Sequence, residues 1–366
     1  MRIASADSPS SFAGPRRIGY ARVGWRVASW VQVDVNGSDQ GTLFELPAPE
    51  IEAAPPAPGA SELAARLPEL VRLGTMSWSF PGWRGLVYAP DAPEGALAAR
   101  GLGAYARHPL LGAVEIDRSY YEPLGASLLA ELAGQVPRQF RFLVKAHEAC
   151  SVRRFPEHAR YGRARGQANP RYLDPSYAAD AVIGPTQSGL GEKLGAIVFQ
   201  FPPSRQELTP EAFAGELGTF LSRLPRGVKY AVELRRADWF GPRYFQALLD
   251  TGAVHCHNAW SAMPPVLGQA KQVPPPARHP LIVRWLLAPG EAYEATRERF
   301  RPFDRLARED QPTRAAIARL VARAAARGVP AIVTINNKAE GCAPASAFRL
   351  AQAIVDASNA PARAAP

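Results

Sequence analysis

The sequence predicts an α/β protein of the (β/α)8 TIM-barrel type. Eight short apolar runs alternate with stretches of helical Ala/Leu/Arg spacing between residues 71 and 357. Buried parallel strands read as near-continuous apolar runs, and Gly or Pro stands at the joins, where helices end. An open, doubly wound sheet is the alternative, but no GxGxxG or GxxxxGK[ST] loop follows any of the runs. A closed barrel is therefore the expected fold.

Each run and each gap has an assignment in this scheme. The expected strands are residues 71–78, 113–117, 140–146, 196–201, 229–234, 253–258, 281–286 and 330–337. The expected helices are residues 94–107, 122–135, 209–222, 241–250, 312–327 and 344–357. The barrel domain is therefore predicted over residues 69–358.

Both ends of the chain differ from this pattern. In residues 1–68, Ser, Gly and Pro interrupt every periodic stretch, and residues 53–60 (AAPPAPGA) are typical of a linker. We expect this N-terminal extension to be poorly ordered, partly disordered or a linker, although residues 27–35 and 42–46 could pair as a hairpin. The tail, residues 359–366, is predicted to be disordered.

Composition excludes several classes of protein. The chain has 366 residues, of which 47% are hydrophobic and 21% charged, so a sizeable core is available. No apolar run approaches the length of a membrane span. The three cysteines are far apart and form no CxxC pair, which argues against a disulfide scaffold or a zinc knuckle. Asp7 and several arginines leave no apolar core for a secretory signal, so a cytoplasmic location is expected.

The net charge of +10 has two explanations. Of the 43 basic residues, 5 are Lys and 38 are Arg, and a chain rich in Arg, Ala and Pro is typical of GC-rich genomes. Codon bias alone would then account for the charge. The other explanation is an anionic partner, either nucleic acid or a phosphorylated or carboxylated small molecule.

Polar residues gather where the predicted strands end. Active sites of barrels lie at the C-terminal ends of the strands, and charged side chains inside apolar strands are costly to bury unless they are paired. The concentration of polar and charged residues at the predicted strand ends therefore indicates a solvated polar pocket. The residues concerned are Trp78, Glu115, Asp117, Lys145, Gln200, Glu233, Arg235, His255, His257, Asn258, Arg284, Asn336, Asn337 and Lys338.

Two pairs within this set suggest specific chemistry. His255 and His257 would point to the same side of a strand and could join Glu115, Asp117 or Glu233 in a mononuclear metal site. Because six histidines are few, we expect neither a bound transition metal nor a cofactor. Glu115 and Glu233 could be the carboxylate pair of a glycoside hydrolase. The alternative for the histidines is that one forms a hydrogen bond within the pocket and the other caps a loop. The alternative for the glutamates is ion pairing with Lys145, Arg235 or Arg284.

The segment after the third strand, residues 147–173, is a long basic insert. It holds six Arg and two Tyr against two Glu. A loop of this length over a barrel mouth is commonly a lid or a binding loop. Arginine suits phosphate or carboxylate, and tyrosine stacks on bases. We expect the insert to border the pocket and to order on an anionic ligand; a solvated basic loop is the alternative.

Six motifs together resemble the YecE-like family, the domain of unknown function numbered 72. They are LGTMSWSFPGWRGLVYAP (73–90), AVEIDRSYYEPL (113–124), FRFLVKA (140–146), LGAIVFQFPPS (194–204), YAVELRRADWF (230–240) and INNKAEGCAPASAFRLAQAI (335–354). The resemblance covers residues from about 70 to 357 and implies a barrel related to the (β/α)8 type. It supplies no reaction, because the activity of the family is not established.

The resemblance also implies a set of polar site positions. These fall on Glu115, Tyr121, Lys145, Gln200, Glu233, Arg235, Arg284, Asn336 and Asn337. Two departures stand out. The usual Glu-x-Asn of the second motif is Glu115-Ile116-Asp117 here, and the Thr-His that commonly follows the third motif's lysine is missing. The second departure weakens a metal or nucleic-acid mechanism that would need that histidine.

The leading hypothesis is a pocket for a small anionic ligand. Lys145, Arg235 and Arg284 would hold the negative group, and Glu115 or Glu233 would act as general acid or base. The predicted catalytic residues are Glu115, Glu233 and Lys145. The predicted ligand-binding residues are Trp78, Tyr121, Gln200, Arg235, Arg284, Asn336 and Asn337.

Alternative functions stay open at this point. The first is a nucleic-acid-binding module or phosphodiesterase that uses the insert, and the second is a glycoside hydrolase. If the protein is an enzyme, a hydrolase or a lyase is expected. The sequence predicts no oligomeric state.

Overall fold

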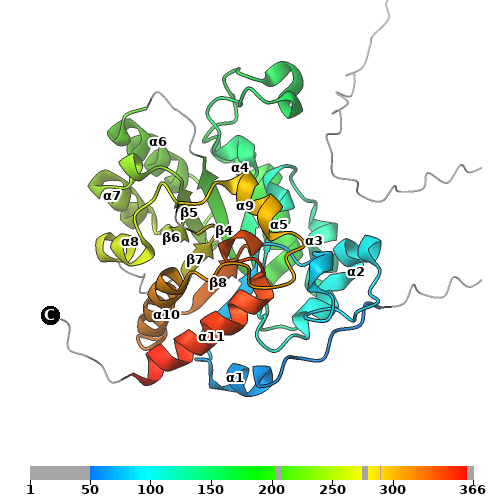
Figure 1. Cartoon of the computed structure of the whole chain (residues 1–366). Coiled ribbons are helices and arrows are strands. Elements are labelled where there is room, and N and C mark those ends of the chain that lie inside the picture. The colour runs from blue at the N-terminus through cyan, green and yellow to red at the C-terminus, as the bar shows by residue number, and fades with distance from the viewer. Residues whose placement is uncertain (1–49, 203–207, 274–278, 289, 361–366) are drawn as a thin grey trace, which may run out of the picture.

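The computed structural model describes residues 50–202, 208–273, 279–288 and 290–360. The expected closed barrel is confirmed: eight parallel strands pair in sequence order, and β8 closes on β1 (Figure 1). The strands are β1 (Val71–Thr75), β2 (Ala113–Ile116), β3 (Arg141–Lys145), β4 (Leu194–Phe201), β5 (Tyr230–Leu234), β6 (Val254–Ala259), β7 (Leu281–Trp285) and β8 (Ala331–Ile335). Each of them overlaps one of the eight predicted runs.

All six predicted helices form within a few residues of their expected bounds. They are α2 (Glu94–Ala106), α3 (Ala126–Gly134), α6 (Pro210–Ser222), α7 (Pro242–Thr251), α10 (Gln311–Ala325) and α11 (Ala343–Asn359). The sequence pattern missed other helical segments, which are α4 (Pro175–Ala178), a π-helical turn (Ala179–Ile183), α5 (Gly184–Leu190), α8 (Val266–Gln272) and α9 (Tyr293–Phe300). They are short or contain Gly and Pro, so helical periodicity has little length in which to show.

The end of the predicted N-terminal extension packs on the barrel. Helix α1 (Ala60–Arg66) lies against α11, with Leu63 buried. Ile51 is also buried, and its carbonyl accepts a hydrogen bond of 2.8 Å from Nη2 of Arg107. The segment predicted as a linker, residues 53–60, is thus attached to the fold. The predicted hairpin and residues 361–366 of the tail lie outside the described residues.

The inside of the barrel changes from apolar to polar along its axis. Side chains alternate between the two faces of each strand. The inner apolar layers are Ala113, Leu143, Ala196, Val198, Ala231, Val254, Cys256, Ile282 and Ile332. Two residues further along the strands, the same inward face carries Glu115, Lys145, Gln200, Glu233, Arg284 and Thr334. A polar layer therefore crosses the barrel at the C-terminal ends of its strands.

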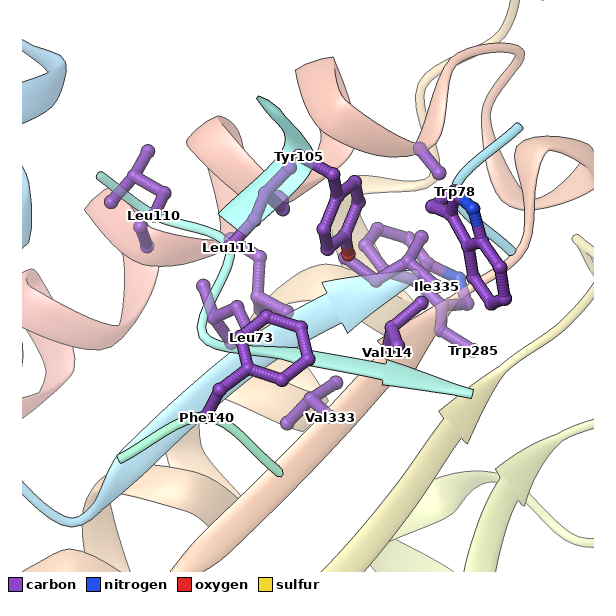
Figure 2. Close-up of a cluster of buried hydrophobic side chains, with 14 of the residues drawn as sticks. Leu73, Trp78, Tyr105, Leu110, Leu111, Val114, Phe140, Trp285, Val333 and Ile335 are labelled. Atoms are coloured by element: carbon purple, nitrogen blue, oxygen red, sulfur yellow. The ribbon is translucent and has the colours of Figure 1, made fainter. Parts of the chain in front are cut away.

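The outward faces of the strands form the main core with the helices. Figure 2 shows Leu73, Val114 and Val333 packed below Tyr105 and beside Phe140. The ring planes of Tyr105 and Phe140 meet edge to face at a centroid distance of 6.2 Å. This core fixes the strands, so the inward polar layer has a rigid support.

Candidate functional site at the C-terminal mouth of the barrel

Arg284 is the centre of the polar layer. Its Nε and Nη2 donate to the two carboxylate oxygens of Glu115 at 2.8 and 2.6 Å, and its Nη1 donates to Glu233 and, at 3.2 Å, to Oε1 of Gln200. The arginine is 1% exposed, and both glutamates are fully buried. Two carboxylates on opposite strands, β2 and β5, are thus bridged by one guanidinium from β7.

On each glutamate, burial raises the pKa and the charge of Arg284 lowers it, and the balance differs between the two. Burial raises the pKa of Glu115, and Arg284 offsets only part of this effect. Burial also acts to raise the pKa of Glu233, but the charges of Arg235 and Arg284 outweigh it and lower that pKa. Of the two glutamates, Glu233 is therefore the one whose ionised form the site favours.

Arg235 extends the network toward the rim. Its Nε donates to Oε1 of Glu233 at 2.8 Å, and its Nη2 donates to Oε1 of Gln200 at 3.1 Å. The guanidinium lies 4.2 Å from the ring centre of Trp260. Among the described residues, nothing accepts a hydrogen bond from its Nη1.

Lys145 forms a second charge pair at the mouth. Its Nζ donates to Oδ1 of Asp117 at 2.8 Å and lies 4.0 Å from the ring centre of Tyr120. The side chain of Asp117 is 41% exposed, in contrast to the two glutamates. Although burial acts to raise the pKa of Asp117, the charge and hydrogen bond of Lys145 lower it. The mouth thus presents an ionised carboxylate to solvent.

Lys338 completes the ring of cations. It follows β8, is 8% exposed, and places its Nζ 4.2 Å from the ring centre of Tyr293. No carboxylate of the described residues lies within ion-pairing distance of this ammonium. Burial lowers its pKa to about 8, although the charge of Asp117 acts in the other direction. Strand-end position was the signal for Lys338, but the sequence prediction did not include it among the site residues.

The predicted site residues divide into three groups. Glu115, Gln200, Glu233, Arg235 and Arg284 meet in the network, and Lys145 pairs with Asp117 at the same mouth. Asn336 adjoins the network through Sδ of Met76, which also contacts Arg284. Tyr121 lies at the rim, 56% exposed, with Arg160 5.1 Å from its ring centre.

The third group has structural contacts instead. The indole of Trp78 is buried in the cluster of Figure 2, and its Nε1 donates to the carbonyl of Ala98 in α2 at 3.2 Å. Oδ1 of Asn337 accepts from Nε1 of Trp83 at 3.2 Å and from the backbone of Ala343 at 2.8 Å, at the start of α11. These contacts favour roles in the fold for both residues.

His255 and His257 point away from the mouth, into the layer of helices. Nδ1 and Nε2 of His255 bond to Tyr244 at 2.9 Å and to Gln269 at 3.0 Å, and Nε2 of His257 lies 3.3 Å from the carbonyl of Val273. The two histidines share one side of the strand, as predicted, but it is the outer side, so the prediction that they join the polar pocket was wrong. In the part of the chain that the structure describes, no three His, Cys, Asp or Glu side chains gather closely enough to hold a metal.

Because His255 and His257 are buried, we expect the stability of the protein to fall in acid. Burial lowers the pKa of His255 to about 4 and that of His257 to about 3, far below the value near 6.5 of an unfolded chain. Unfolding at pH 5 must therefore take up protons, so stability is present above pH 6.5 and is lost as the pH falls toward 4. We expect the free energy of unfolding to fall by roughly 1 kcal/mol per pH unit and per histidine in this window.

The measurement is denaturant unfolding at several pH values, together with calorimetric proton uptake at pH 5. Replacing both histidines with Gln should reduce the uptake by up to about two protons. Uptake at pH 5 that is unchanged in the double variant would contradict the prediction.

The basic insert is held by contacts within the protein. Both carboxylate oxygens of Glu216 in α6 lie 3.0 Å from Nη1 of Arg153. Arg160 pairs with Glu148, and Arg171 lies 4.4 Å from the ring centre of Tyr177. These internal partners offset the repulsion that the arginines of the insert exert on one another. Between the insert and α6 lies an open cavity of about 670 Å³, lined by Arg153, Tyr172 and Phe220 among others.

Part of the insert reaches the mouth, as predicted. Arg160 lies between the rings of Tyr121 and Tyr161, with the Tyr161 hydroxyl donating to Glu148 at 3.0 Å. A loop of the insert, with the helical turn Ala159–Ala164, projects from the barrel near α4 (Figure 1). Arg160, in this turn, connects the insert to Tyr121 at the rim of the candidate site.

Eight parallel strands and an outer layer of helices define a (β/α)8 barrel, and its charge network lies at the end where the active sites of such barrels are found. The chain belongs to the family described as "Protein of unknown function DUF72", whose model matches residues 72–366. The resemblance stated from the motifs is thereby confirmed. No curated protein matches the sequence.

Solved structures of the same family show a similar fold. A DUF72 family protein from Thermotoga maritima is 18% identical, with a TM-score of 0.53 over 77% of this chain and 98% of its own. A DUF72 family protein from Enterococcus faecalis is 17% identical, with a TM-score of 0.52 over 79% of this chain and 96% of its own. These likenesses support the fold alone. In the described residues, no helix is both long and apolar enough to cross a bilayer.

Proposed function

We propose that the C-terminal mouth of the barrel binds a small ligand with a phosphate or carboxylate group. The observation that carries the proposal is the charge balance of the mouth. Four cations, Lys145, Arg235, Arg284 and Lys338, face three carboxylates, Glu115, Asp117 and Glu233. One positive charge therefore remains, and an anion would satisfy it.

The contacts assign different parts to the cations. All three nitrogens of the Arg284 guanidinium are already engaged, so this residue holds Glu115 and Glu233 in place. Lys145 uses one of its three donors on Asp117, and Arg235 has one free edge. We therefore assign the anionic group of the ligand to Lys145, Arg235 and Lys338.

Asp117 is the best placed general base. A general base must come within hydrogen-bond reach of the proton that it removes. Glu115 and Glu233 have no exposed surface and are bound to Arg284, whereas Asp117 is ionised and partly exposed. The same contacts remove the support for a glycoside hydrolase, since the arginine stands between its two candidate carboxylates. The internal partners of the insert likewise leave nucleic-acid binding without a specific observation in its favour.

The proposal predicts that inorganic phosphate or malonate binds at the mouth. Titration calorimetry should show one site per chain, with Lys145→Met weakening the binding about tenfold, the loss of one charge-assisted hydrogen bond. Lys271→Met is the matched control, because Lys271 is exposed on α8. Equal affinity of the parent and the Lys145→Met variant for both anions, or no binding of either, would overturn the proposal.

A further inference from the structure

We propose that Lys338 forms an imine with a carbonyl group of the ligand, so that the substrate class is a small phosphorylated or carboxylated aldehyde or ketone. This inference rests on the proposed anion site and deepens it. The reaction would be of the lyase or isomerase type that an amine in a barrel mouth can start. The argument has three parts: the surroundings of the amine, the rarity of lysine in the chain, and the neighbouring base.

The surroundings of Lys338 suit a nucleophilic amine. A lysine becomes nucleophilic when its ammonium is removed from water without a compensating carboxylate. Lys338 is 8% exposed, its Nζ faces the ring of Tyr293, and the described residues place no carboxylate in contact with it. The charged groups that act on it are Asp117 across the mouth and Glu294 and Arg297 on α9. At pH 7, about one molecule in ten would carry the free amine.

The composition makes a lysine at this position informative. The chain has 38 Arg and only 5 Lys, so a position that needs no more than a positive charge carries Arg in most cases. Arginine cannot lose its proton under these conditions, whereas lysine can. Two of the five lysines, Lys145 and Lys338, lie in the mouth of the barrel. Lys145 is committed to Asp117 and Lys338 is not.

The other lysines do not share these surroundings. Lys193 donates to the carbonyls of Ala133 and Val136 at 2.6 and 2.7 Å. Lys229 and Lys271 are exposed. Lys338 is thus the one lysine of the described residues that is buried at the mouth without a hydrogen-bonded or ion-paired acceptor.

The chemistry balances without an oxidant or a reductant. The lone pair of Nζ attacks the carbonyl carbon, and the oxygen takes up a proton to give a carbinolamine. Loss of that oxygen as water then forms the C=N bond, and both amine protons have left the nitrogen of the neutral imine. Asp117, which is ionised and whose charge acts on Lys338, can accept a proton from the nitrogen. Lys145 and Arg235 would hold the anionic group meanwhile.

Pyridoxal 5′-phosphate is a suitable probe, because it carries an aldehyde and a phosphate. The full chain is incubated with it at pH 7.5, reduced with cyanoborohydride and mapped by peptide mass spectrometry. The hydride converts the imine into a stable secondary amine. We expect one adduct per chain on Lys338, formed about tenfold or more faster than on Lys229 or Lys271, because burial without a carboxylate partner favours the neutral amine of Lys338.

Lys338→Arg is the decisive variant, because it keeps the charge and cannot form an imine. It should lose the adduct. Lys271→Arg is the matched control and should keep the adduct on Lys338. Labelling of the parent protein that is spread over the exposed lysines or confined to the N-terminal amine would overturn the imine proposal, even if the Lys338→Arg variant did not fold.

Competition separates this inference from the proposed function. Inorganic phosphate should slow the labelling of Lys338 if the anion site is real. Labelling of Lys338 that phosphate leaves unchanged would support the amine and overturn the anion site. Phosphate binding without labelling of Lys338 would support the anion site and overturn the imine, and the absence of both would overturn both.

Discussion

Arg284→Met should destabilise the protein by roughly 3–5 kcal/mol at pH 7, the usual cost of leaving buried charge unpaired. Glu115 and Glu233 are fully buried and lose their shared partner in this variant. Methionine matches the length of the arginine stem, so the loss reflects charge more than volume. The measurement is chemical unfolding of the parent and the variant under the same conditions.

The pH dependence of the destabilisation by Arg284→Met tests whether unpaired buried charge causes it. Without Arg284, the folded-state pKa of Glu115 should rise further above that of the unfolded chain, and the pKa of Glu233 should also rise, although Arg235 still acts to lower it. A folded state that binds more protons than the unfolded state gains stability as the pH falls. The difference between variant and parent should therefore shrink between pH 7 and 5. A difference that is constant over this range would contradict the electrostatic explanation.

Arg138→Met is the matched control. Arg138 pairs with Glu192 at 3.0 Å, but the two side chains are 85% and 74% exposed. Exposed pairs contribute about 0–1 kcal/mol, so this variant should unfold almost as the parent does. An Arg284→Met variant no less stable than Arg138→Met would show that the network at the mouth does not hold the barrel together.

Gly74→Ala should cost at least about 3 kcal/mol, because the barrel has no room for a side chain there. Gly74 lies in β1 opposite Ala113 of β2, and a Cβ at this position would stand 2.0 Å from the Ala113 carbonyl oxygen. The obstacle is backbone, which cannot turn aside as a flexible side chain can. Pairing of β1 with β2 must therefore open.

Gly215→Ala should change the stability of the protein in the opposite direction. Gly215 is exposed within α6, and a Cβ there would meet nothing within 4 Å. Alanine in an exposed helix interior should stabilise the protein by about 0.5–1 kcal/mol. Thermal and chemical unfolding of both variants would check the pair. Similar midpoints for Gly74→Ala and the parent would contradict the close approach of the two strands.

The candidate site was only partly predictable. Strand-end position identified Glu115, Lys145, Glu233 and Arg284, because the C-terminal ends of parallel strands meet at one mouth. It could not show that Arg284 would bind both glutamates, since such pairing depends on distances across the barrel. It also grouped His255 and His257 with the site, because a period of two places residues on a shared face without saying which face is inward.

Local sequence determined the elements that repeat, and tertiary packing decided the rest. The eight apolar runs and six periodic helices follow from hydrophobic pattern alone, as does the closed barrel that they build. The helical segment 175–190 does not follow from it, because Gly184, Pro185 and Gly189 weaken any local helical preference. Its Gly189 instead lets the backbone approach α3, where a Cβ would stand 2.6 Å from the Ala126 carbonyl oxygen. The sequence likewise shows Lys338 at the end of a strand. Only the tertiary structure shows that no carboxylate of the described residues pairs with it.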